Sequence, residues 1–117
     1  MKVSELEGKD LDYWVAKAQE WTKHCDWWID TSDIKKESLE KYPVSKYTPS
    51  TNGGQCFELM KLDSFRWVEK LRGEYNAMFN QLDKLIVLTT GPTLNIAICR
   101  AFVASVYGEE VPDEQPM

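Results

Sequence analysis

Two segments of the sequence carry residue types that bind anions where a helix begins: residues 49–54 and residues 89–93. Hydroxyl groups and flexible glycine backbones favour a phosphate there, because the N–H groups of a helix start and the positive end of its dipole point at the ligand. The same hydroxyl groups are also the usual caps of helices, so a purely structural role stays open. The candidate ligand-binding residues of the two segments are Ser50, Thr51, Gly53, Gly54, Gly91 and Thr93.

A cation and an aromatic ring accompany these segments. Arg100 falls two turns into an apolar stretch, where a buried guanidinium needs a carboxylate, backbone carbonyls or a phosphate. Alternatively, its long stem carries the charge to the rim of the core. Tyr47 stands just before the first segment, and its ring is suited to stacking on a nucleobase. We therefore expect an anionic ligand, if the protein binds one, between the 50–51 loop and the 91–93 helix start, with Arg100 or a neighbouring cation completing the charge.

The tryptophans divide into two groups. Trp14, Trp21 and Trp67 fall on apolar stripes, which favours positions in the core. Trp27 and Trp28 are adjacent, so they cannot both point the same way on a helix or a strand. One of these two is therefore expected to be exposed, at an interface or at a ligand.

Catalytic and metal-binding chemistry find little support in the sequence. His24 and Cys25 are adjacent, and neighbouring side chains rarely face each other as a nucleophile and its base must. The acidic pairs at residues 109–110 and 113–114 lack the third ligand and the fixed geometry of a metal site. We therefore expect no catalytic residues, no metal and no cofactor.

The element expected at the centre of the fold is a helix over residues 92–107. Pro92 suits a first helical position, and Gly108 suits the end of the helix. The apolar residues between them leave almost no polar face, which is typical of a buried helix. The stretch is shorter than the roughly 18 apolar residues of a membrane span, and three polar residues interrupt it. The pattern therefore predicts the core helix of a soluble domain, with no membrane partner.

Two further helices are predicted before it. The first starts near Asp10 and runs through Trp21, because apolar residues recur at helical spacing. The second runs to Met60 from a cap at Ser50, Thr51 or Asn52, with Gln55 completing a capping box if Asn52 is the cap. Between them the signal is weak, and residues 31–39 are compatible with a short helix that ends before Pro43.

The expected fold class is α+β, with one small three-stranded antiparallel sheet packed by helices around the C-terminal helix. Apolar and polar residues alternate over residues 65–70 and 74–80, and residues 84–89 form a continuous apolar run that reads as a strand covered on both faces. Residues 72–74 predict a tight reversal between the first two strands. Tyr75, Ala77 and Phe79 should share one face of their strand and meet the 92–107 helix.

Length and composition limit the class of protein further. The 117 residues predict one domain over residues 1–108, followed by an acidic, solvated tail over 109–117. A net charge of −5 argues against general nucleic-acid binding, which needs a basic face. Three widely spaced cysteines fit neither a zinc site nor a disulfide framework, and the N-terminus has no apolar signal region. These features favour a reducing, cytoplasmic location.

Both ends of the sequence and its middle loop contain short segments that occur together, in this order, in a known family. These segments are Met1-Lys2-Val3-Ser4-Glu5-Leu6, Leu11-Asp12, Val15-Ala16-Lys17-Ala18, Tyr47-Thr48-Pro49-Ser50-Thr51, Gly91-Pro92-Thr93-Leu94, Arg100, Val103-Ala104-Ser105, Gly108, Glu110-Val111 and Pro112-Asp113-Glu114. They resemble the NinX-like bacteriophage proteins and, more weakly, the wider group of small phage proteins with a helix–sheet–helix sandwich. Two departures are visible: residues 22–46 look like an insertion, and the family's usual Trp-Ala-Gln between Ser-Thr and Gly-Gly is missing. The resemblance implies a small protein made by a phage in the host cytoplasm and implies no particular biochemistry.

Two functions of different classes follow from these observations. In the first, a non-enzymatic accessory protein sequesters a phosphorylated nucleotide that signals host defence. In the second, the protein binds a host protein and blocks it; an uncharacterised hydrolase is a minor third possibility. We also expect a homodimer or higher oligomer with residues 24–46 contributing, because Trp27, Trp28 and Ile29 are hard to bury in a domain whose core is already supplied.

Overall fold

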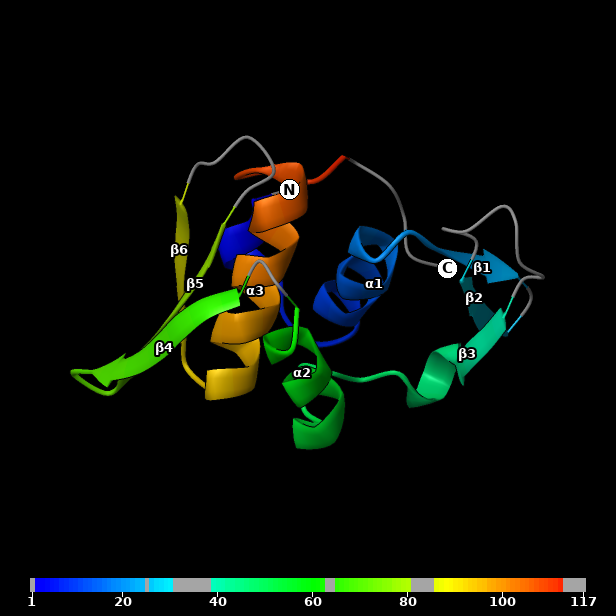
Figure 1. Cartoon of the computed structure of the whole chain (residues 1–117), viewed down its shortest axis with the longest axis horizontal. Helices are drawn as coiled ribbons and strands as arrows, with labels where there is room; N and C mark the ends of the chain where they lie inside the picture. The colour runs from blue at the N-terminus through cyan, green and yellow to red at the C-terminus, as the bar shows by residue number, and fades with distance from the viewer. Residues whose placement is uncertain (1, 25, 31–38, 63–64, 81–85, 113–117) are drawn as a thin grey trace.

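Three α-helices and two three-stranded antiparallel sheets make up the described part of the chain, so the fold is α+β as predicted (Figure 1). The structure is a computed structural model that describes residues 2–24, 26–30, 39–62, 65–80 and 86–112. The sequence predicted one of the two sheets. The elements, in order, are the 3-10 helix η1 (Val3–Glu5), α1 (Gly8–Ala18), β1 (Trp21–His24), β2 (Trp27–Asp30), β3 (Leu39–Pro43), the 3-10 helix η2 (Val44–Lys46), α2 (Gly53–Met60), β4 (Phe65–Leu71), β5 (Glu74–Asn80), β6 (Ile86–Gly91) and α3 (Leu94–Tyr107).

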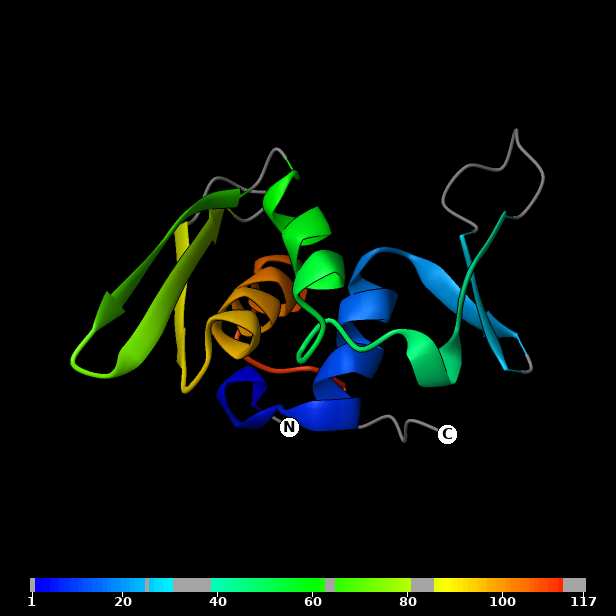
Figure 2. The same cartoon turned by 90° about the horizontal axis from the view of Figure 1, so that it is seen from below.

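Helix α3 is the centre of the fold, as the sequence predicted. It lies between the sheet β4–β6 on one side and α1 on the other (Figures 1 and 2). Every residue from 97 to 105 is buried. The helix begins at Leu94 rather than at Pro92, because the Thr93 side chain accepts a hydrogen bond from the Ile96 N–H at 3.1 Å and caps the first turn. Gly108 ends the helix with a φ of 87°, a conformation that favours glycine.

The sheet β4–β6 confirms the predicted meander. Ala77 and Phe79 are fully buried, and the Phe79 ring lies 5.8 Å from that of Phe102 in α3. This face of β5 therefore meets the central helix, as its alternating pattern indicated. Strand β6 is described from Ile86, so the expected strand start at residues 84–85 lies outside the described residues.

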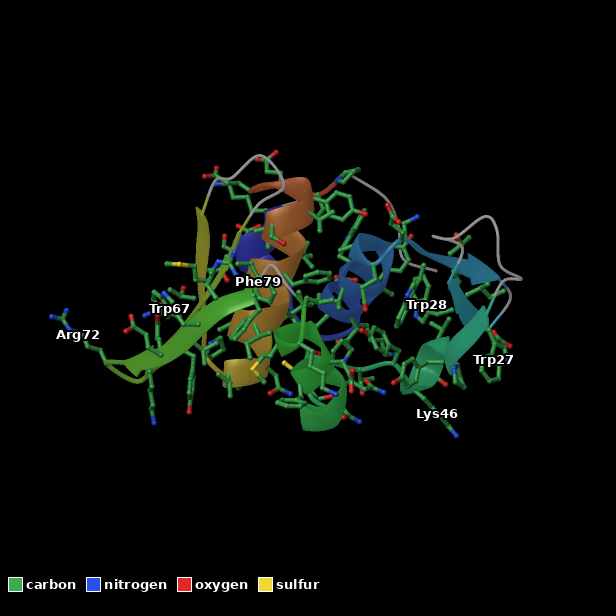
Figure 3. All side chains as sticks on the ribbon, viewed as in Figure 1. Trp27, Trp28, Lys46, Trp67, Arg72 and Phe79 are labelled. Carbon is green, nitrogen blue, oxygen red and sulfur yellow. The ribbon has the colours of Figure 1, made fainter. Side chains whose placement is uncertain are left out.

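The prediction that Trp67 belongs to the core is wrong. A register shift between Phe65 and Trp67 breaks the alternation, so that Phe65 pairs with Phe79 while Trp67 pairs with Met78. The shift leaves Phe65 and Val68 packed against the core and turns Trp67 to the opposite face, where its side chain is 38% exposed (Figure 3).

Helix α1 uses the predicted apolar stripe but is shorter than expected. Trp14 is buried, and its ring meets that of Tyr107 edge to face at 5.3 Å. The helix starts at Gly8 and ends at Ala18, because the chain reverses at Glu20, whose φ is 66°. Trp21 therefore belongs to β1 and not to the helix. Its half-buried ring packs instead on Tyr42 and Tyr47.

Strands β1, β2 and β3 form a second sheet, here called the β1–β3 meander, in the segment where the sequence signal was weak. Trp28 pairs with Lys23 on β1 and with Tyr42 on β3. Figure 2 shows the meander on the far side of α1 from the sheet β4–β6. The short helix expected over 31–39 is contradicted at Leu39, which begins β3, and residues 31–38 lie outside the described residues.

Residues 2–3 and 109–110, near the two ends of the described chain, lie side by side. Lys2 and Glu110 form an isolated antiparallel bridge, and the Val3 N–H donates to the Glu109 carbonyl at 2.9 Å. Val111 is 4% exposed, so the segment expected to be a solvated tail contributes a side chain to the core. Residues 113–117 lie outside the described residues.

Candidate functional site

The loop before α2 is held by side chains of its own helix. The Asn52 side chain accepts a hydrogen bond from the Gln55 N–H at 3.0 Å, which confirms the predicted cap. The predicted capping box is only half formed, because the Gln55 carboxamide reaches further back along the chain. Its oxygen accepts from the Thr48 N–H at 2.7 Å, and its nitrogen donates to the Lys46 carbonyl at 2.9 Å. Gln55 therefore fixes the chain just before the predicted anion loop.

Among the residues predicted from this loop, Ser50 is the buried one. Its N–H donates to Asp12 Oδ1 at 2.8 Å, and its Oγ is buried with no hydrogen-bond partner in the described part of the chain. The Thr51 hydroxyl donates to the Thr48 carbonyl at 3.3 Å, which is a turn contact within the loop. Gly53 and Gly54 are exposed in the first turn of α2.

The second predicted helix start adjoins the first. The Asn95 side chain donates to the Pro49 carbonyl at 3.2 Å, which joins α3 to the loop before α2. Thr93 is exposed and its hydroxyl caps α3. Gly91 is buried, and a Cβ at this position would lie 2.7 Å from the Ala97 nitrogen. The close approach of the two backbones accounts for this glycine without a ligand.

Arg100 donates hydrogen bonds to backbone carbonyls, which are one of the three kinds of partner expected for it. The residue is 9% exposed. Its Nε donates to the Leu6 carbonyl at 2.8 Å, and one terminal nitrogen donates to the Thr90 carbonyl at 3.1 Å. The guanidinium thereby ties the N-terminal segment to the end of β6, next to Gly91.

Tyr47 is a buried member of an aromatic cluster. Its ring lies 4.9 Å from that of Trp21 and 5.0 Å from that of Tyr42. Its hydroxyl accepts a hydrogen bond from the Gln19 side chain at 2.7 Å. Burial raises the pKa of the Tyr47 hydroxyl, while the Gln19 hydrogen bond opposes the shift. The hydroxyl is therefore neutral and fixed in position.

An open pocket of about 590 Å³ lies beside Tyr47, between α1 and the β1–β3 meander. Its volume is typical of a site for a small molecule. Tyr13 and Trp28 lie against each other in its wall, with their ring centroids 5.6 Å apart. The aromatic residues that line the pocket are Tyr13, Trp27, Trp28 and Tyr47, and the charged ones are Lys9, Asp12, Lys23 and Asp26.

The adjacent tryptophans point in opposite directions, as predicted. Trp28 is 1% exposed and points toward α1, whereas Trp27 is 40% exposed and points away from it (Figure 3). The pair therefore supplies both a buried wall and an exposed indole to the same pocket. The predicted contact of the exposed residue with a partner or a ligand stays a prediction.

The charged residues of the pocket are not neutralised by one another. Within the described residues, Lys9, Lys23 and the Asp26 carboxylate form no ion pair or side-chain hydrogen bond. Asp12 differs, because its Oδ1 accepts from Ser50. Burial raises the pKa of the Asp12 carboxyl group, while the hydrogen bond from the Ser50 backbone N–H opposes the shift.

Most residues of this pocket were not predicted from the sequence. Tyr47 was predicted to contact a ligand, and one of Trp27 and Trp28 was expected to be exposed, whereas Lys9, Lys23 and Asp26 were not predicted as site residues. The adjacent tryptophan pair was the one feature of the local sequence that pointed to the pocket. The charged residues come from separate elements, and lysine and aspartate are common at protein surfaces.

Comparison with known proteins defines the class. The family model described as "Bacteriophage P22, NinX" matches residues 2–106, which is most of the chain. The chain belongs to this bacteriophage family. A search of curated proteins found no match. Among the described residues, no helix has the length and apolar character needed to cross a membrane, and no group of three or more His, Cys, Asp or Glu side chains is placed to hold a metal ion.

Proposed function

We propose that this phage protein is a non-enzymatic binding protein that sequesters a phosphorylated nucleotide in the host cytoplasm and thereby counters host defence. The observation that supports the proposal is the aromatic pocket beside α1, in which Lys9 and Lys23 have no ion-pair partner among the described residues. The aromatic wall suits the base of a nucleotide, and the two ammonium groups, unpaired within the described residues, suit its phosphate.

The energetics of such a site are favourable for a small ligand. Stacking of a base on an aromatic side chain contributes about 1–3 kcal/mol. The protein carries a net charge of −5 and repels a phosphate at long range, so binding must come from local donors. Lys9 is exposed and Lys23 is half-buried, and both offer charge-assisted hydrogen bonds in this position.

The pocket is a stronger candidate than the site predicted between the two helix starts. There the Thr93 hydroxyl caps its helix, Thr51 donates within its loop, and Arg100 donates to two carbonyls. Those groups already have partners in the protein, whereas the two pocket lysines have none among the residues that the structure describes. The helix-start site stays a prediction and is tested alongside the pocket.

The test is a thermal-shift screen of the purified protein against nucleoside mono-, di- and triphosphates and cyclic nucleotides, followed by calorimetry. A ligand at a hundredfold excess over its Kd should stabilise the fold by roughly 2.7 kcal/mol. Lys23→Ala should weaken binding at least tenfold, and Lys70→Ala, on an exposed position of β4, should leave it unchanged. If Thr51→Ala loses nucleotide binding while Lys23→Ala binds as the parent does, the ligand binds at the helix starts and not in the aromatic pocket.

The same experiment separates the alternatives. Recovery of the bound nucleotide intact by chromatography is expected, and its conversion to product would indicate the hydrolase instead. Exposed large apolar side chains favour the second function, the blocking of a host protein: Phe57 is 52% exposed, and Leu62 and Trp67 are each 38% exposed. Absence of any nucleotide binding, with capture of one host protein that Trp67→Ala abolishes, would replace the nucleotide proposal with this alternative.

A further inference from the structure

The turn between β1 and β2 places a carboxylate at the aromatic pocket. Asp26 is exposed and lines the pocket next to Trp27. Its backbone carbonyl accepts a hydrogen bond from the Val44 N–H at 2.7 Å, which ties the turn to η2. Within the described residues its carboxylate has no hydrogen-bond or ion-pair partner. The position of the residue is therefore fixed while its acceptor oxygens stay available.

The second carboxylate of the pocket is already engaged. Asp12 is 7% exposed, and its Oδ1 accepts from the Ser50 N–H at 2.8 Å. This contact, together with those that Gln55 and Asn95 make to residues 46–49, fixes the wall formed by Tyr47 and Thr48. Asp12 is therefore a positioning residue, and Asp26 is the carboxylate that a ligand can reach.

The chemistry of a carboxylate discriminates among the bases. An ionised carboxylate only accepts hydrogen bonds, so it selects two donors that stand side by side. Guanine has such a pair, N1–H and the N2 amino group. Adenine and cytosine place a ring-nitrogen acceptor beside their amino group, and uracil places its single N3–H between two carbonyl oxygens. In adenine and cytosine, one carboxylate oxygen would therefore face the lone pair of the ring nitrogen. In uracil, a carbonyl oxygen flanks the N3–H on each side, so the second carboxylate oxygen would face a lone pair in either orientation.

We infer that the pocket selects a guanine nucleotide, with Asp26 accepting from guanine N1–H and N2–H while Lys9 and Lys23 bind the phosphate. The inference rests on the proposed nucleotide-binding function and specifies its ligand class. The exposed indole of Trp27, adjacent to Asp26, offers a face for the purine, and the half-buried ring of Tyr13 and the buried ring of Trp28 form the wall beside it.

The test compares ligands that differ in one group. Calorimetry with guanosine, inosine, adenosine and uridine 5′-monophosphates should show the highest affinity for the guanosine compound. Inosine is the matched comparison, because it lacks only the N2 amino group. A bidentate contact to a base discriminates by about 1–3 kcal/mol, which is about five- to 150-fold in Kd. Asp26→Asn should reduce the preference for guanosine over inosine to less than threefold. Glu74→Gln, on an exposed position at the start of β5, should leave it unchanged.

The outcomes separate this inference from the function on which it rests. Equal affinity for the four monophosphates, or a guanosine preference that persists in folded Asp26→Asn, would overturn the guanine assignment and leave nucleotide binding in place. Failure of every nucleotide to bind would remove the proposed function and the assignment together. The guanosine–inosine comparison uses the unaltered protein, so it decides the question even if Asp26→Asn does not fold.

Discussion

Arg100→Met tests whether this guanidinium stabilises the fold or serves a ligand. The substitution keeps most of the apolar stem and removes the hydrogen bonds to the Leu6 and Thr90 carbonyls. Hydrogen bonds to charged groups contribute about 1.5–3 kcal/mol each, so the two together are worth roughly 3–6 kcal/mol. Removing the desolvation cost of the buried charge offsets part of this loss. We expect the free energy of unfolding to fall by about 3 kcal/mol.

A loss of this size is measurable in a domain of 117 residues, whose total stability is expected to be roughly 6–17 kcal/mol. The variant should remain folded, with a Tm lower by roughly 12 °C. Urea unfolding followed by tryptophan fluorescence gives the free energy, and circular dichroism gives the Tm. Arg72→Met is the matched control, because Arg72 is exposed at the tip of the β4–β5 hairpin (Figure 3). It should change stability by less than about 0.5 kcal/mol.

Two results would refute the reasoning for Arg100. The first is a stability loss no larger than that of the Arg72 control, which would mean that the two carbonyl contacts contribute nothing. The second is a variant as stable as the parent that no longer binds nucleotide. That outcome would assign the guanidinium to a ligand at the 91–93 helix start, as the sequence predicted.

Three further predictions follow. Trp28→Ala should lower stability by about 3–5 kcal/mol in urea unfolding, because the side chain is 1% exposed; a loss under 1 kcal/mol would contradict its core position. Since burial raises the pKa of Asp12 in the folded state, its charge costs stability at neutral pH, and this cost disappears as pH falls through the raised pKa toward the ordinary value near 4. Asp12→Asn, which keeps an acceptor for Ser50, should therefore gain stability relative to the parent at pH 7 and lose that advantage at pH 3.5; a relative gain that grows on acidification would reverse the sign. Light scattering at high micromolar concentration should give the mass of a dimer or higher oligomer in which residues 24–46 contribute; a monomer mass would refute the oligomer.

The parts of the fold that the sequence predicted are those with a local pattern. Helix α3 is apolar nearly all round, and β5 alternates strictly, so both were identified from residues close in sequence. The β1–β3 meander was missed because Trp27 and Trp28 interrupt any clear period. Trp67 was misplaced because a register shift in β4 depends on its pairing with β5 and leaves no trace in composition.

The candidate site was less predictable than the fold. The hydroxyl groups of Ser50 and Thr51 can be identified from the local sequence, which left open whether they bind an anion or have a structural role. The pocket is assembled from residues 9 to 48, which lie on a helix, a hairpin and a loop. Their proximity depends on how the β1–β3 meander packs on α1. A single sequence does not show which residues of these separate elements come into contact.

The position of the β1–β3 meander has a consequence for how such proteins diversify. The meander lies on the far side of α1 from the sheet β4–β6 (Figure 2). Its Trp28 ring packs against Tyr13 of that helix. The core around α3 is built mainly from other elements. The meander's exposed positions, such as Trp27, can therefore change in sequence while the core persists, whereas Trp28, Tyr42 and Val44 pack on the core and are under structural constraint. If the proposed pocket binds a nucleotide, proteins that share this core can exchange the exposed residues of its wall, so that the framework and the ligand preference evolve separately.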